Sequence, residues 1–132
     1  RKLVLTVEEL MHTGDQLPRV FQDAPMKDVI FEISSKRLGV AAVMNRDGEI
    51  VGVVTDGDLR RAIERFNDVL SKNASDVMTK NPKAIKKDAL ATYALKKMEE
   101  FSITSLFVVE KVGERRPVGI IHIHDLLKAK IA

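Results

Sequence analysis

The sequence predicts an α+β protein built from two repeats, each in the order strand, helix, strand, strand, helix, packed around a pseudo-twofold axis. Residues 50–61 read IVGVVTDGDLRR and residues 117–128 read PVGIIHIHDLLK, so an apolar strand runs twice into a helix that carries an Asp-Leu pair. Aligning the Asp of each pair gives an offset of 67 residues, which also superposes Gly52 on Gly119. Such self-similarity at a fixed spacing indicates a duplicated structural unit.

The other strands follow from short apolar runs next to turn residues. VAAVM and SLFVV each precede a turn, NRDGE in the first repeat and the longer EKVGERR in the second. Because the offset between these runs is 65, the two extra residues fall in the turn, where an insertion is tolerated. LPRV and PKAI supply the first strand of each repeat, and each contains a Pro that disfavours helix.

The helices follow from apolar spacing of i, i+3, i+4 and i+7, which places those residues on one helix face. The positions with this spacing are Met26, Val29, Ile30 and Ile33 in the first repeat, and Ala91, Ala94, Leu95 and Met98 in the second. Closing helices are expected over residues 58–65 and 125–130. The strand that precedes the crossover helix joins the following hairpin through a right-handed connection, giving a three-stranded sheet with two helices on one face.

Three segments are expected along the chain: a first repeat with an N-terminal linker over residues 1–65, a linker over 66–73, and a second repeat over 74–132. A unit of about 60 residues buries too little surface to be more than marginally stable alone, so each repeat is expected to need the other. The chain begins with Arg rather than Met, which suggests a piece of a longer protein, and no signal peptide is visible.

Composition excludes several classes of function. With no Cys, the 132 residues form neither disulfides nor thiolate metal sites. No apolar run approaches the roughly 20 residues that cross a bilayer, so no membrane partner is expected. Aromatic residues are 5% and Trp is absent, which removes the stacking platform of single-strand nucleic-acid binders. The net charge of +3 suits a small anionic ligand better.

The first candidate site is the strand-to-helix corner at Thr55 and Asp58. A carboxylate accepts from both ribose hydroxyls, and a hydroxyl at a helix N-terminus meets a phosphate beside unpaired N–H groups. Arg60 and Arg61 add positive charge for that phosphate. The alternative is that Thr55 and Asp58 only cap the helix.

In the second repeat His122 and His124 replace the Thr and Gly of the first, while Asp125 is retained. Histidines at i and i+2 of an extended corner point the same way and can bond an anion. A bound metal at His122 and His124 is the weaker alternative, since further ligands are not evident. His12 either borders this site or belongs to a plain linker loop. The divergence favours one asymmetric ligand site over two equal ones.

Catalysis by this chain is not expected, and neither is a cofactor. The DGD at residues 56–58 has the Asp-x-Asp spacing of phosphoryl-transfer enzymes, but Asp56 aligns with Ile123 in the second repeat. No catalytic residue is therefore assigned.

Two sets of motifs carry a resemblance to known families. The repeated pattern DVMT…P…D…A…M…V…VGII…D resembles the cystathionine β-synthase (CBS) domain pair, or Bateman module. EELMHTGDQLP, TDGDLRR and HIHDLLKA together resemble the tail of arabinose 5-phosphate isomerases of the KpsF/GutQ type.

The resemblance implies a regulatory chain attached to a sugar isomerase (SIS) domain. That domain converts ribulose 5-phosphate to arabinose 5-phosphate for Kdo and lipopolysaccharide synthesis. CBS pairs bind nucleotides between their repeats, so AMP, CMP or CMP-Kdo is the implied ligand. The resemblance also implies a cytoplasmic protein that forms a homodimer or part of a homotetramer; the alternative is a ligand-free scaffold for the isomerase domain.

Overall fold

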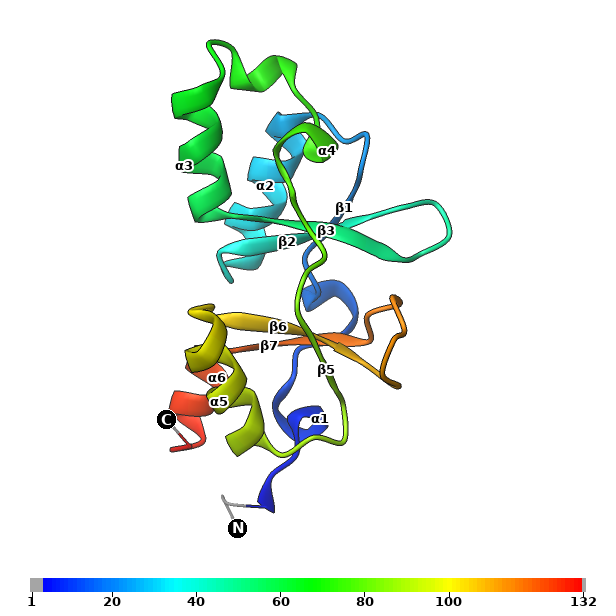
Figure 1. The fold of residues 1–132 in the computed structure, drawn as a ribbon, viewed down its shortest axis with the longest axis vertical. Helices are drawn as coiled ribbons and strands as arrows, with labels where there is room; N and C mark the ends of the chain where they lie inside the picture. The colour runs from blue at the N-terminus through cyan, green and yellow to red at the C-terminus, as the bar shows by residue number, and fades with distance from the viewer. Residues whose placement is uncertain (1–3, 132) are drawn as a thin grey trace. The chain divides into compact units, whose positions relative to one another are not determined.

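The structure is a computed structural model that describes residues 4–131. It separates into two compact units (Figure 1). One comprises residues Leu17–Pro82; the other combines the described residues up to Gln16 with those from Lys83 onward. No helix in the described residues is long and apolar enough to span a membrane.

The unit formed by Leu17–Pro82 is a four-stranded sheet covered by helices. Its strands are β1 (Arg19–Phe21), β2 (Val40–Met44), β3 (Ile50–Thr55) and β4 (Thr79–Lys80), in the spatial order β1-β2-β3-β4. β1 is parallel to β2, and the other pairs are antiparallel. The helices are α2 (Met26–Lys36), α3 (Asp56–Arg65), α4 (Ala74–Val77) and the 3₁₀ turn η3 (Val69–Ser71). Figure 1 shows α2 and α3 on the same side of the sheet.

The other unit repeats this plan with three strands. They are β5 (Ala84–Lys86), β6 (Ser105–Val109) and β7 (Gly119–His122), in the order β5-β6-β7. Its helices are α1 (Val7–Leu10), α5 (Ala91–Phe101), α6 (Ile123–Lys128) and the 3₁₀ turn η2 (Gly14–Gln16). The predicted α+β class and the strand and helix order are confirmed.

The sheet of the first unit has a fourth strand that the sequence did not predict. Thr79 pairs with Val53 of β3, next to the pairing of Lys80 with Gly52. In the other unit a single bridge between His12 and Ile120 occupies the equivalent place. Residues 11–12 and 78–80 are therefore equivalent segments that add to the edge of the last strand of each sheet.

The compact units and the sequence repeats do not have the same boundaries. Helix α1 lies at the start of the first repeat in sequence but packs against β7 and α5 of the second. Helix α4 lies at the start of the second repeat but packs against β3 and α3 of the first. Each short helix thus covers the sheet of the other repeat. The residues expected as a linker include both η3 and the cap of α4, Asn73.

Each unit has its own hydrophobic core. Residues 17–82 bury Met26, Val29, Ile33, Ala41, Val43, Val54 and Ala74. The second core contains Val7, Ile85, Ala91, Ala94, Met98, Leu106, Val108, Ile121 and Leu126. Six of the eight apolar helix positions predicted from spacing are among these residues, because the amphipathic faces of α2 and α5 turn toward their sheets. Leu95 is partly buried against the second core, whereas Ile30 is 36% exposed, so its predicted place in the core is wrong.

The glycine of each Val-Gly pair makes room for a methionine from the added segment. A Cβ on Gly52 would lie 2.5 Å from Sδ of Met78 and 2.9 Å from the carbonyl oxygen of Thr79. A Cβ on Gly119 would lie 2.7 Å from Sδ of Met11 and 2.8 Å from the carbonyl oxygen of His12. Real Cβ atoms do not approach other atoms so closely, so only glycine leaves room for the methionine at these positions. The methionine packing in turn fixes the position of the residue that follows it.

Candidate ligand site

The corner between β3 and α3 brings Thr55 and Asp58 together. The backbone N–H of Thr55 donates to Oδ2 of Asp58 at 2.9 Å, and the N–H of Asp58 donates to Oγ1 of Thr55 at 3.1 Å. The Thr55 hydroxyl also lies 3.0 Å from Oδ2. This reciprocal arrangement is a capping box, which satisfies N–H groups left free at a helix start. The predicted capping role is confirmed.

Asp58 has two further partners outside the cap. The hydroxyl of Thr79, in β4, donates to Oδ1 at 2.8 Å, and the guanidinium of Arg61 donates to the same oxygen at 2.8 Å. With four hydrogen bonds, the carboxylate uses about all of its lone-pair positions. Asp58 is only 5% exposed. Burial alone would raise the pKa of Asp58, but the hydrogen bonds from Thr55, Thr79 and Arg61 together hold this pKa below its ordinary value.

The other first-repeat candidates are placed differently. Arg60 is exposed and does not contact Asp58, whereas Arg61 reaches back across the first turn. A Cβ on Gly57 would lie 3.3 Å from the Arg61 guanidinium. The space beside this glycine therefore holds the arginine side chain.

The corner between β7 and α6 repeats the cap with different groups. The N–H of His122 donates to Oδ2 of Asp125 at 2.8 Å, and the N–H of His124 donates to Nδ1 of His122 at 3.1 Å. Oδ1 of Asp125 faces Nε2 of His12 at 2.7 Å. His12 therefore contacts the predicted site residue directly.

His122 is a neutral capping group. It is 7% exposed, and its Nδ1 accepts a hydrogen bond, which requires the unprotonated nitrogen. Burial lowers the pKa of His122, and the charges of His124 and His12 lower it further, while Asp125 opposes them. A positive charge near neutral pH is therefore not favoured at His122. Of the pair, His124 is the exposed ring, with its centroid 4.5 Å from that of His122.

The metal alternative gains no further ligands from the structure. Between residues 4 and 131, no group of three or more His, Cys, Asp or Glu side chains is arranged to hold a metal ion. Within this part of the chain, His122 and His124 have no third protein ligand to complete a zinc site, which needs at least three.

Two residues of these corners were not singled out from the sequence. Thr79 bonds Asp58, and Gln16 places its Oε1 2.8 Å from Nδ1 of His12. The sequence does contain a signal for Thr79, because the 67-residue offset superposes this residue on the candidate site residue His12. No comparable signal marks Gln16.

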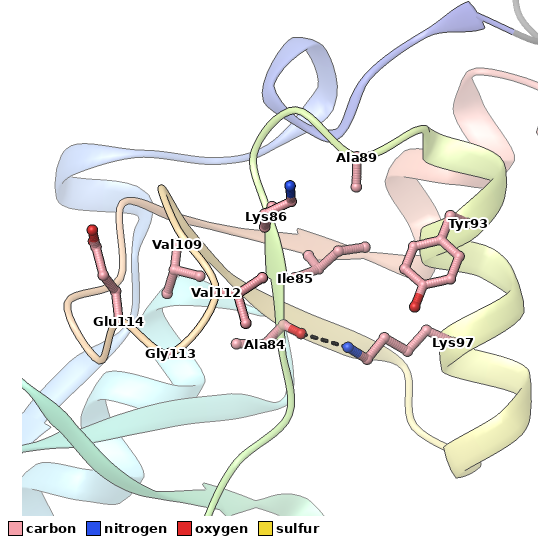
Figure 2. Close-up of a pocket in the computed structure, with 10 residues that line it drawn as sticks. All are labelled: Ala84, Ile85, Lys86, Ala89, Tyr93, Lys97, Val109, Val112, Gly113 and Glu114. Carbon is pink, nitrogen blue, oxygen red and sulfur yellow. Dashed lines mark hydrogen bonds between the residues drawn. The ribbon is translucent and has the colours of Figure 1, made fainter.

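A separate cavity of about 250 Å³ lies beside the edge of β5 (Figure 2). Its lining comes from β5, α5 and the β6–β7 turn, including Ile85, Tyr93, Lys97 and Val112. Nζ of Lys97 donates to the carbonyl oxygen of Ala84 at 2.8 Å. This bond from helix α5 occupies a carbonyl oxygen at the edge of the sheet, which is then less available for pairing with another chain. The cavity shares no residue with either corner.

The fold and the two corners define a duplicated α+β module in which each repeat closes with a helix whose first turn holds a hydrogen-bonded Asp. The chain belongs to the CBS domain family: residues 7–65 and 74–132 each match the CBS domain. The predicted family is thereby confirmed.

Known proteins extend this comparison. The chain is 40% identical over 131 residues to arabinose 5-phosphate isomerase KdsD of Pseudomonas aeruginosa, covering 99% of this chain and 40% of that protein. It is 41% identical to KdsD of Francisella tularensis subsp. tularensis, again over 99% of this chain and 39% of the relative. The chain thus spans about two fifths of the length of these relatives.

Among solved structures, the CBS domain protein PAE2072 from Pyrobaculum aerophilum, complexed with AMP, superposes with a TM-score of 0.79. The two share 26% sequence identity, over 97% of this chain and all of the other.

Proposed function

We propose that this chain is the regulatory C-terminal part of an arabinose 5-phosphate isomerase and senses a nucleotide or nucleotide sugar. The ligands proposed are AMP, CMP and CMP-Kdo, the last being the activated end product that the isomerase pathway feeds. An N-terminal SIS domain of the same polypeptide catalyses the isomerisation. The assembly is a cytoplasmic homodimer or part of a homotetramer.

One observation supports ligand binding more than any other. Asp125 accepts two hydrogen bonds from the described residues, whereas Asp58 accepts four. A carboxylate has about four lone-pair positions, so Asp125 retains capacity for two more donors. A vicinal diol of ribose supplies two donors on neighbouring carbons.

The remaining candidates fit around this diol. His124, exposed beside the same cap, is available to a phosphate or carboxylate. Thr55, Asp58, Arg60 and Arg61 form the corresponding corner of the first repeat. There, a ligand hydroxyl has to replace Thr79 or Arg61 on the Asp58 carboxylate. The asymmetry supports a single ligand site over two equal ones.

Calorimetric titration of the chain with AMP, CMP and CMP-Kdo tests the proposal. A ligand that binds only the folded state must also raise the melting temperature. Binding heat and a rising melting temperature with at least one nucleotide are expected. Absence of both with all three would reject the sensing role.

The second candidate function is a ligand-free oligomerisation scaffold for the isomerase domain. It is favoured by large apolar side chains exposed on helices of residues 17–82: Phe31 of α2 is 71% exposed and Ile63 of α3 is 64% exposed. A contiguous patch of exposed apolar side chains marks a protein interaction site, so these helices are the surface that a scaffold would use. Light scattering of the Ile63→Glu variant tests this candidate, since a dimer mediated by these helices should dissociate, and a variant that remains dimeric would reject it.

A further inference from the structure

The N-terminal segment delivers a side chain to Asp125. The N–H of His12 donates to the carbonyl oxygen of Ile120 at 2.8 Å, and the Ile120 N–H donates to the carbonyl oxygen of His12 at 3.0 Å. Met11 packs against Gly119 immediately before this bridge. These contacts hold the backbone of residues 11–12 along β7 and bring the His12 ring to the α6 corner, where the ring's contact with Asp125 adds to the hold on this segment.

The ring makes a short contact that is partly open to solvent. Nε2 of His12 lies 2.7 Å from Oδ1 of Asp125, with side-chain exposures of 30% for the His and 12% for the Asp. Oδ1 has no other partner among the hydrogen bonds of the described residues, because the cap uses Oδ2. His12 is thus the donor closest to the acceptor that we assign to the ligand.

We propose that the ligand diol and the His12 imidazole compete for Asp125, so that ligand binding releases residues 11–16 from the α6 corner. This inference rests on the proposed function. Asp125 has lone pairs left, but its side chain is only 12% exposed and the more exposed His12 ring lies directly at Oδ1. A diol that approaches both carboxylate oxygens from solvent therefore has to displace the ring, whereas the backbone N–H of His122 remains on Oδ2.

Competition predicts whether removing the His12 ring tightens or weakens ligand binding. If His12 only oriented Asp125, removing its ring would weaken ligand binding. Under competition, removal frees Oδ1 and tightens binding. A hydrogen bond to a charged group corresponds to a several-fold change in affinity even when partly exposed, so about three- to tenfold tighter binding is expected. By reciprocity, a ligand that displaces the ring also loosens the segment that carries it.

The experiment compares ribonucleoside and ribonucleotide affinities of the wild-type chain with those of His12→Ala and His12→Phe. Phe retains the ring volume but lacks a donor, and thermal unfolding verifies that each variant is folded. Thr13→Ala is the matched control, because Thr13 is exposed in the same segment and its side chain has no contact with Asp125. Adenosine and cytidine serve as uncharged probes beside AMP and CMP.

Tighter binding in both His12 variants with wild-type affinity in Thr13→Ala supports competition. Equal or weaker binding in both variants overturns it while the proposed function stands. Binding by none of the proteins overturns the proposed function and the inference together.

Hydrogen exchange supplies a second readout. The His12 N–H is protected by its bond to Ile120, so ligand addition is expected to speed its exchange. Unchanged or slower exchange at saturating ligand overturns release of the segment, even if the affinities change as expected.

Discussion

The strand-to-helix corners of the two units, β3–α3 and β7–α6, have the same capping arrangement but differ in the number of hydrogen bonds that each Asp accepts. Asp58 takes its extra hydrogen bond from a threonine hydroxyl and its ion pair from Arg61. Asp125 takes a single histidine contact, and Lys128, which aligns with Arg61, is exposed. Duplication has thus left one corner with a saturated carboxylate and the other with a carboxylate that still has free acceptor positions.

The difference separates two roles for the same residue type. A buried carboxylate with every acceptor position used contributes mainly to stability, because each lost bond leaves a donor unpaired. A carboxylate with spare positions and partial exposure is available to exchange partners. Mutations that compare the two corners therefore measure how far these roles have diverged.

The largest expected difference is between the two Asp→Ala substitutions. Asp58→Ala should lower the free energy of unfolding by about 3 kcal/mol, since it leaves Thr55 N–H and the Thr79 hydroxyl without acceptors. Asp125→Ala should cost about 1 kcal/mol, because it loses fewer bonds at a more exposed place. Urea denaturation of each protein measures both values.

Asp56→Ala is the control for the helix start. Asp56 is exposed in the first turn of α3 and lies outside the Asp58 bond network, so its substitution should change stability by no more than about 0.5 kcal/mol. Equal losses from the two capping Asp residues would contradict the distinction between the corners.

The next effect concerns the glycines that receive the methionines. Gly52→Ala and Gly119→Ala should each lower stability by about 2 kcal/mol, because the added methyl group overlaps a methionine sulfur and a backbone carbonyl oxygen. Thermal unfolding reports both losses, and Gly119→Ala should also displace His12 from Asp125.

Gly57→Ala is the matched control for these substitutions. Its new methyl group would meet the far end of the flexible Arg61 side chain and make an ordinary contact of 3.6 Å with Oγ1 of Thr55. Alanine also favours the helix by about 1 kcal/mol over glycine. Wild-type or higher stability is expected for Gly57→Ala, and wild-type stability in Gly52→Ala would refute the packing argument.

Much of this comparison follows from local sequence. Strands VAAVM and SLFVV have the bounds predicted, because apolar runs between turn residues leave little freedom. Thr55 and Asp58 were placed together correctly because an i, i+3 relation at a helix start is local. Helix α3 begins at Asp56 rather than at Asp58 as predicted, since Thr55 caps it and the first turn includes the residues between.

Contacts that depend on distant pairing could not be predicted. Strand β4 has two exposed residues and therefore no apolar period to mark it. His12 and Asp125 are 113 residues apart, and their contact depends on Met11 packing against Gly119. The repeat offset relates Thr79 to His12, but it does not indicate that either reaches an Asp of the other repeat. Spatial proximity of that kind requires the fold.

A smaller effect distinguishes the corners by pH. Because the pKa of His122 is lowered in the folded chain, the unfolded chain binds more protons around and below the ordinary histidine pKa of about 6.5. The free energy of unfolding should therefore decrease as pH falls below about 6.5 and lose this dependence at higher pH. Denaturation at a series of pH values measures the slope.

His122→Thr installs the capping residue of the first repeat and should flatten this slope while retaining a side-chain acceptor for the helix start. Thr55→Ser, a conservative change at the other cap, should leave the slope as in the wild type. A slope that His122→Thr leaves unaltered would mean that His122 is not the source of the pH dependence.

The smallest expected effect is that of the ion pair between Arg61 and Asp58 in the first corner. The Arg61 side chain is 67% exposed although its partner Asp58 is buried, so solvent screens the pair. Arg61→Ala should lower stability by about 0.5 kcal/mol, and raising the salt concentration should reduce the difference from the wild type. Arg60→Ala, one residue away with no contact to Asp58, should have no effect. If Arg61→Ala lowers stability nearly as much as Asp58→Ala, the arginine is the main stabilising partner of Asp58. A small loss means that the Thr55 cap and the Thr79 hydroxyl stabilise the carboxylate instead. Thr79 is the donor whose place His12 occupies in the second repeat.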